Sequence, residues 1–197
     1  MARPEKFSAE AILDAAARVV LARGGTVTVA EIAREAGAPI GSVYHRFASR
    51  ELLLVSLWLR SVRDFQRGFI EACRTEPAAD AVVAAALHIP VYCRAHPAEA
   101  RAMTLYRHAE LIRTAPEVLL EEVTAVNNEV NAVSHDLTRR RYAVVDERRT
   151  ALLRAATRQC PYGLVRPYLG GPIPDWIDEA TIACARAIAA LGDLAAE

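Results

Sequence analysis

The sequence predicts an all-α fold, in which an N-terminal three-helix head with a helix-turn-helix precedes a longer helical domain. Three observations support this prediction. Apolar residues recur at helical spacing along most of the 197 residues, runs with strand-like alternation are scarce, and residues 28–54 carry closely spaced signals for the starts and ends of short helices. Because 53% of the residues are hydrophobic, the chain can bury a sizeable core.

The first helix of the head is expected between Ser8 and Gly24-Gly25. Ser8 can cap the helix, and Phe7 and Ile12 stand where a hydrophobic staple places its two apolar residues. The apolar positions of this helix have helical spacing and are expected to pack on the two helices that follow: Ile12, Ala16, Val19 and Val20.

The second helix is predicted to begin at Thr28 and to end at Gly37. Thr28 and Glu31 have the spacing of a capping box, in which the hydroxyl accepts from a first-turn N–H group and the carboxylate accepts from the backbone of the cap residue. Gly37 can adopt the left-handed conformation that ends a helix without a Cβ clash. A tight turn therefore follows.

The third helix is predicted to start near Pro39, because proline tolerates the first turn of a helix. Val43 and Phe47 recur four residues apart as a buried stripe. The opposite face presents hydrogen-bonding groups to solvent or to a ligand: Ser42, Tyr44, His45 and Arg46. Ser49 can cap a fourth helix that carries Glu51 in its first turn.

The remaining sequence is predicted to be helical. Helix four extends to about Arg74 and is long enough to join the head to a second domain. A helix over about 79–94 is bent or broken at Pro90. The other expected segments are a helix over 97–107, a long amphipathic stretch over 117–142, and two final helices over 146–168 and 174–194. Gly170, Gly171, Pro172 and Pro174 separate the last two.

Residues 8–54 resemble the DNA-binding head of the TetR family of bacterial transcriptional regulators. The resemblance covers about a quarter of the chain and rests on Ile32-Ala33, Ala36-Gly37, Gly41-Ser42-Val43-Tyr44, Phe47, Ser49 and Glu51-Leu52. Two positions depart from the family pattern. Pro39-Ile40 stands where the family has serine and a polar or basic residue, so base readout could be unusual, and Arg50 stands where it has lysine.

The resemblance implies a set of DNA contacts. Thr28 would contact phosphate at the start of the second helix, and Tyr44 and Arg50 would clamp the backbone on either side of the groove. Arg46 would read guanine, a contact worth roughly 1–3 kcal/mol of discrimination. The full expected set is Thr28, Pro39, Ile40, Gly41, Ser42, Tyr44, His45, Arg46 and Arg50. The alternative for Tyr44 is a half-buried helix residue, and for Arg46 a solvated charge.

The resemblance also implies two domains, with DNA binding in residues 1–50 and effector binding and dimerisation in residues 51–197. The expected function is transcriptional regulation, as a repressor that a small-molecule effector releases from double-stranded operator DNA. An activator is not excluded. The alternative is an all-helical small-molecule-binding protein or enzyme whose head does not bind DNA. No catalytic motif such as Gly-x-Ser-x-Gly or His-Glu-x-x-His is present, so no enzymatic activity is expected.

A homodimer is expected through the last two helices. Their apolar positions are Leu152, Leu153, Ala156, Cys160, Leu164, Ile177, Ile182, Ala185, Ile188 and Ala189. An intrachain core needs the same stripes, so periodicity leaves both interpretations open. Reading two half-sites about 34–36 Å apart favours the dimer.

An effector pocket is expected among the middle helices. The candidate lining residues are aromatic or soft side chains with a few polar groups, as in small-molecule sites generally. They are Trp58, Phe65, His88, Tyr92, Met103, Tyr106, His108 and Asn127. Each of them can equally be an ordinary core residue.

Charge and sulfur content set broader limits. Lysine and arginine total 24, as do aspartate and glutamate, so no long-range field attracts a polyanion. Residues 1–50 carry seven basic and five acidic side chains, a weak basic excess. The four cysteines are widely spread and are expected to be buried free thiols in a reducing cytoplasm. The His and Cys residues lack metal-ligand spacing, so we expect no metal, and we expect no cofactor. No secretion signal or membrane span is recognisable, so we expect no membrane contact and a cytoplasmic location.

Overall fold

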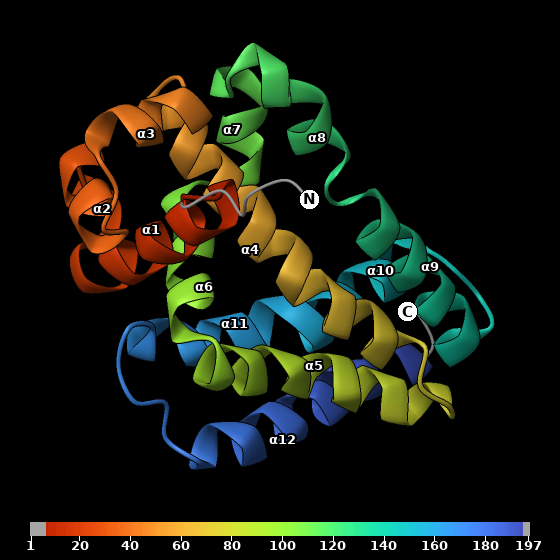
Figure 1. Cartoon of the computed structure of the whole chain (residues 1–197). Coiled ribbons are helices and arrows are strands. Elements are labelled where there is room, and N and C mark those ends of the chain that lie inside the picture. Colours follow the sequence, from red (N-terminus) through yellow and green to blue (C-terminus); the bar gives the residue numbers. More distant parts are fainter. Residues whose placement is uncertain (1–6, 195–197) are drawn as a thin grey trace, which may run out of the picture. The chain divides into compact units, whose positions relative to one another are not determined.

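The computed structural model describes residues 7–194 and, over that range, consists of helices and connecting turns without a β-strand (Figure 1). Arg3, Glu5 and Lys6, which enter the predicted charge balance of the head, lie outside the described residues. The chain forms two compact units. Within the described residues, the first contains residues 7–62 and 97–126, and the second contains residues 63–96 and 127–194. The predicted boundary at residue 50 concerns the roles of the two parts and stays a prediction.

The first unit begins with four helices in the predicted order: α1 (Ala9–Arg23), α2 (Val29–Glu35), α3 (Ile40–Arg46) and the start of α4 (Arg50–Cys73). A short turn, η1 (Gly24–Thr26), links α1 to α2. The remaining elements are α6 (Pro97–Ala102), η2 (Met103–Leu105), α7 (His108–Thr114), η3 (Glu117–Leu119) and α8 (Leu120–Ala125).

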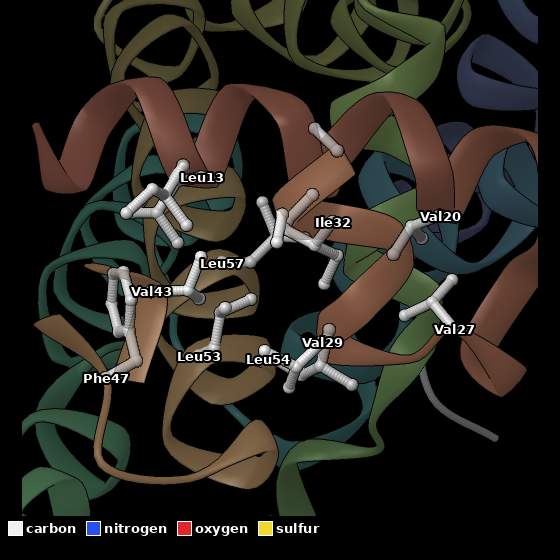
Figure 2. Packing of buried hydrophobic residues seen from close by; sticks show 14 of the residues in the cluster. Leu13, Val20, Val27, Val29, Ile32, Val43, Phe47, Leu53, Leu54 and Leu57 are labelled. Atoms are coloured by element: carbon white, nitrogen blue, oxygen red, sulfur yellow. The ribbon is translucent and has the colours of Figure 1, made fainter. Parts of the chain in front are cut away.

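A single apolar cluster holds the head together (Figure 2). Ile12, Ile32 and Val43 are fully buried and come from α1, α2 and α3 respectively. Leu53, Leu54 and Leu57 of α4 complete the cluster. Burying a side chain of this size contributes about 1.5–3 kcal/mol, so the orientation of α3 is fixed by its own core-facing residues.

The second unit contains the end of α4 with α5 (Ala78–Ala95), α9 (Asn128–Tyr142), α10 (Glu147–Arg154), α11 (Cys160–Val165) and α12 (Trp176–Ala190). Short turns follow α11 and α12, namely η5 (Arg166–Tyr168) and η6 (Leu191–Asp193). Its core is built around Phe69, Leu137 and Leu153 with alanines of α5 and α12. α5 is long and apolar enough to cross a membrane by length and composition alone, and 44% of that window is buried.

Two expectations for the middle of the chain were wrong in detail. Residues 108–114 form α7, which the sequence did not predict, and the stretch predicted over 117–142 is divided into η3, α8 and α9. The His108 ring makes a 2.8 Å hydrogen bond with the Val123 carbonyl oxygen. This contact spans 15 residues, so it is absent from any local sequence pattern. Pro90, in contrast, lies inside an unbroken α5.

The helix predicted over 146–168 contains a wider turn. Residues Ala155–Gln159 form a π-helical turn, η4, in which the Cys160 N–H donates to the Ala155 carbonyl. Pro161 follows at the start of α11. Proline has no N–H, and its ring collides with the carbonyl four residues earlier in a regular α-helix. A widened turn just before Pro161 relieves that collision.

The four cysteines are free, as expected. Cys73 and Cys93 are buried, and burial raises the pKa of each thiol to about 11. Cys160 and Cys184 are only half-buried, contrary to the expectation of full burial. Their thiols hydrogen-bond to each other, and burial together with this bond raises the pKa of Cys160.

Candidate nucleic-acid interface

The interface is built on the start of α2, where the predicted capping box is present. The Thr28 Oγ1 accepts from the Glu31 N–H at 3.3 Å, and the Glu31 carboxylate accepts from the Thr28 N–H at 2.8 Å. The Thr28 hydroxyl also donates to this carboxylate at 2.9 Å. These bonds with Thr28, aided by the positive charge of Arg23, lower the pKa of Glu31. Because a hydroxyl has one donor, Thr28 must release Glu31 before it can donate to a phosphate.

The turn between α2 and α3 depends on Gly37. Its φ is +62°, and nothing lies within 4 Å of where a Cβ would be. Glycine is therefore needed for its backbone conformation and not for space. The Ala38 N–H donates to the Ala33 carbonyl at 2.9 Å, which closes the turn. The exit direction of the chain from α2 is set by these local bonds.

The α3 helix carries two different faces. Val43 is fully buried and Phe47, just after the helix, is 7% exposed. Ile40 and Tyr44, one turn apart, are 48% and 47% exposed. Gly41 and His45 are also exposed, whereas Ser42 and Arg46 are half-buried. Pro39 precedes the helix at its N-cap position, one residue earlier than the expected first-turn place, and supplies no side-chain cap.

Arg50 is engaged inside the head. Its Nε donates to the Val27 carbonyl at 2.7 Å, and its Nη2 donates to the Gly25 carbonyl at 2.5 Å. Two of the five N–H donors of the guanidinium therefore hold the loop before α2. Ser49 caps α4 as predicted, accepting from the Leu52 N–H at 3.0 Å. A direct role of Arg50 on phosphate stays a prediction.

The candidate effector residues fall into two separate groups. In the first unit, the Trp58 indole donates to the Met103 carbonyl at 3.2 Å. The rings of Trp58 and His108 lie nearly parallel, with centroids 6.2 Å apart. Burial, followed by the neighbouring Glu51 carboxylate, raises the pKa of Tyr106. Trp58 is 4% exposed and belongs to a core cluster with Leu111 and Val123.

The second unit holds the other four candidates, Phe65, His88, Tyr92 and Asn127. The Phe65 ring centroid lies 4.9 Å from that of His88 and 5.3 Å from that of Tyr92. The His88 Nε2 donates to the Phe65 carbonyl at 2.8 Å, and burial lowers the pKa of His88. Two polar residues that sequence reasoning missed complete this group.

These missed residues are Asp64 and Gln66. The Tyr92 hydroxyl donates to Asp64 at 2.7 Å, and the Gln66 amide donates to Asn127 at 3.0 Å. Gln66 is only 9% exposed. A buried glutamine was detectable in the sequence because it interrupts the apolar face of helix four, but its partner 61 residues away was not. Within residues 7–194, no group of three or more His, Cys, Asp or Glu side chains could hold a metal ion.

Comparisons with known proteins agree with this geometry. Residues 12–57 match the family model "Bacterial regulatory proteins, tetR family", which covers α1 through the first turns of α4. No curated protein matches the chain. Its fold is similar to those of solved structures with low sequence identity.

Three of these structures illustrate the likeness. A transcriptional regulator from Rhodococcus sp. RHA1 is 21% identical, with a TM-score of 0.73 over 96% of this chain and 100% of that one. The TetR family regulator PfmR from Thermus thermophilus is 18% identical, with a TM-score of 0.71 over 91% and 97%. The ketosteroid transcriptional regulator KstR2 of Mycobacterium tuberculosis is 20% identical, with a TM-score of 0.69 over 96% and 95%. Through its match over residues 12–57, the head of this chain belongs to the TetR family of bacterial regulatory proteins, and the chain is a DNA-binding transcriptional regulator.

Proposed function

We propose that this regulator is a cytoplasmic repressor, which binds operator DNA as a homodimer and leaves it when a small-molecule effector binds. The DNA-binding part of the proposal rests on how α3 is packed against the head. Val43 and Phe47 anchor the helix in the core, while Ile40, Tyr44 and His45 remain exposed. A short helix held in this way can enter the major groove, where base edges are distinguishable.

The proposed contacts divide into positioning and readout. Thr28, Tyr44 and Arg50 position the head on phosphates, which carry no sequence information themselves. Ser42, His45 and Arg46 face base edges, together with the Pro39-Ile40-Gly41 segment. Each neutralised phosphate releases counterions, so binding weakens as salt rises.

Dimerisation is supported by the two faces of α12. Ile177, Thr181, Ala185 and Ala189 recur every four residues and are buried. A second stripe on the same helix is exposed and includes Trp176, Ala183, Ala187 and Ala190, together with the charged Glu179 and Arg186. Small residues allow a second helix to approach closely.

The ten apolar positions expected from periodicity divide into two sets. Leu152, Cys160, Leu164, Ile182 and Ile188 are half-buried. Leu153, Ala156, Ile177, Ala185 and Ala189 are buried within one chain, so they serve its own core. The exposed stripe remains for a second copy, in an arrangement that presents two recognition helices to two half-sites.

Effector binding is proposed to act through α4. This helix begins soon after the end of α3 and carries both Trp58 and Phe65, one from each group of candidate pocket residues. A ligand that contacts either residue has a continuous helix leading to the head. It shifts the population away from the DNA-competent state by as much as its affinities for the two states differ.

The proposal is tested by measuring binding to DNA from the region upstream of the gene, at several salt concentrations. Specific binding that weakens with salt is expected. Tyr44→Ala should weaken DNA binding. Comparison with Tyr44→Phe should distinguish the contribution of the hydroxyl group from that of the aromatic ring. Arg50→Ala should also weaken binding. Arg113, which is exposed on α7, provides the matched control, and Arg113→Ala should bind normally. Absence of specific, salt-sensitive binding to upstream or selected DNA would overturn the proposal.

A further inference from the structure

The exposed face of α3 is unusually apolar for a surface that reads bases. Ile40 exposes nearly half of its side chain in the first turn, directly after the exposed Pro39. Tyr44 lies one turn further along the same face. The side chains at positions 39 and 40 contain no hydrogen-bonding group.

The chemistry of the major groove limits what such a side chain can contact. Base edges present hydrogen-bond donors and acceptors, and the C5 methyl of thymine is the apolar group among them. An isoleucine placed against a donor or acceptor of a base would exclude water from that group without replacing its hydrogen bond. Such desolvation has an unfavourable free energy. Against a thymine methyl, both partners bury apolar surface.

The neighbouring Gly41 favours a close approach. Apart from its chain neighbours and the backbone of its own helix, no described atom lies within 4 Å of where its Cβ would be, and the residue is exposed. The α3 backbone beside Ile40 therefore carries no side chain that would hold it away from the base edges. The apolar surface of Pro39 and Ile40 can reach the floor of the groove.

We propose that Ile40, flanked by Pro39, is a specificity-determining residue that recognises thymine C5 methyl groups in each half-site. This inference rests on the proposed DNA-binding function and assigns the selectivity to a methyl group, independently of hydrogen-bond readout by Ser42, His45 or Arg46. The operator carries thymine at the position facing Ile40 in both half-sites.

Replacing thymine by deoxyuridine tests the idea, because it removes the methyl group and leaves every hydrogen-bonding group in place. The operator is first selected from random duplexes, and each thymine is then replaced in turn, symmetrically in both half-sites. Burial of one methyl group corresponds to about a fourfold change in affinity. We therefore expect about 15-fold weaker binding at the sensitive position, where two methyl groups are lost.

Ile40→Ala provides the decisive comparison. This variant should bind the thymine operator more weakly than the wild type and should bind the thymine and deoxyuridine operators equally. The matched control is Ile112→Ala, since Ile112 is an exposed isoleucine on α7, and it should keep both the affinity and the methyl dependence. Equal melting temperatures would show that the exposed substitution leaves the fold intact.

The outcomes are distinguishable. Wild-type binding that tolerates deoxyuridine at every thymine overturns the inference while leaving the DNA-binding function standing. Methyl dependence that persists in Ile40→Ala overturns the assignment to Ile40. A protein that selects no operator at all overturns the proposed function, and the inference with it.

Discussion

Arg94 and Asp178 form a two-point ion pair between α5 and α12. The Arg94 Nη2 lies 3.0 Å from Oδ1 of Asp178, and the Nη1 lies 3.2 Å from Oδ2. This pairing raises the pKa of Arg94. The Arg94 Nε also reaches the Ile173 carbonyl at 3.5 Å. One side chain thereby connects α5 to both α12 and the loop before it.

Breaking this pair should cost a modest amount of stability. Each side chain is 33% exposed, so solvent screens the charges, and a coupling free energy of about 1 kcal/mol is expected. Urea unfolding of Arg94→Ala, Asp178→Ala and the double variant measures it. Arg94→Lys should recover only part, because an ammonium cannot make the two parallel bonds. Strictly additive single costs would contradict the prediction.

Gly68→Ala should destabilise the second unit. An added Cβ would lie 2.4 Å from the His88 ring, which is itself held by the Phe65 carbonyl. Such overpacking costs about 1–3 kcal/mol. In a His88→Ala background the same change should be stabilising, because the space is open and alanine favours helix. Gly41→Ala, with no neighbour within 4 Å, is the control. A destabilising effect of Gly68→Ala in both backgrounds would refute the steric explanation.

His88 should make stability depend on pH. Burial lowers its pKa in the folded chain below the ordinary value of 6.5. The unfolded chain therefore binds a proton more readily, and the contribution of His88 is complete above pH 6.5 and lost as pH falls toward its folded-state pKa. The free energy of unfolding, measured in urea at about pH 7.5 and pH 5, should fall more in the wild type than in His88→Gln. Equal losses in both proteins would exclude this role.

Ala187→Glu should dissociate the proposed dimer without unfolding the chain. Ala187 lies in the exposed stripe of α12, where a carboxylate would be buried without a partner. Sedimentation should report a monomer with an unchanged helical circular dichroism spectrum, and operator affinity should fall. Ala132→Glu on α9, also an exposed alanine, should remain dimeric. A dimeric Ala187→Glu would place the interface elsewhere.

The head was predictable because its determinants are local. The Thr28–Glu31 capping box, the left-handed Gly37 and the Ser49 cap each act within a few residues. Such signals are visible in a single sequence. The bounds of α1 to α4 therefore lie within about two residues of the expected ones.

Elsewhere, long-range contacts decided the outcome. Arg50 was expected to clamp the DNA backbone, which stays a prediction, and its bonds to the carbonyls of Val27 and Gly25, 23 and 25 residues earlier, were not foreseen. Likewise, His108 at the start of α7 bonds to the Val123 carbonyl, 15 residues later in the chain. Periodicity identifies an apolar face but not its partner, which explains why half of the predicted dimer stripe is buried in the core of one chain.

The candidate pocket residues also show that sequence patterns do not identify long-range partners. Composition selected aromatic and polar side chains for a single pocket, and some of them are neighbours in the structure, such as Phe65 and His88. It could not divide the candidates into two groups, because that division depends on tertiary folding. Nor could it find Asp64 or Gln66, whose partners are distant in the sequence.

The contacts that hold the head together around α3 have a practical consequence for engineering. Arg50 holds main-chain carbonyls, and Val43 and Phe47 supply the anchoring side chains, so none of these contacts uses the exposed positions 40, 41, 44 and 45. Those positions can be randomised together while the scaffold is kept constant. The head is therefore a suitable starting point for reprogramming a regulator toward a chosen promoter.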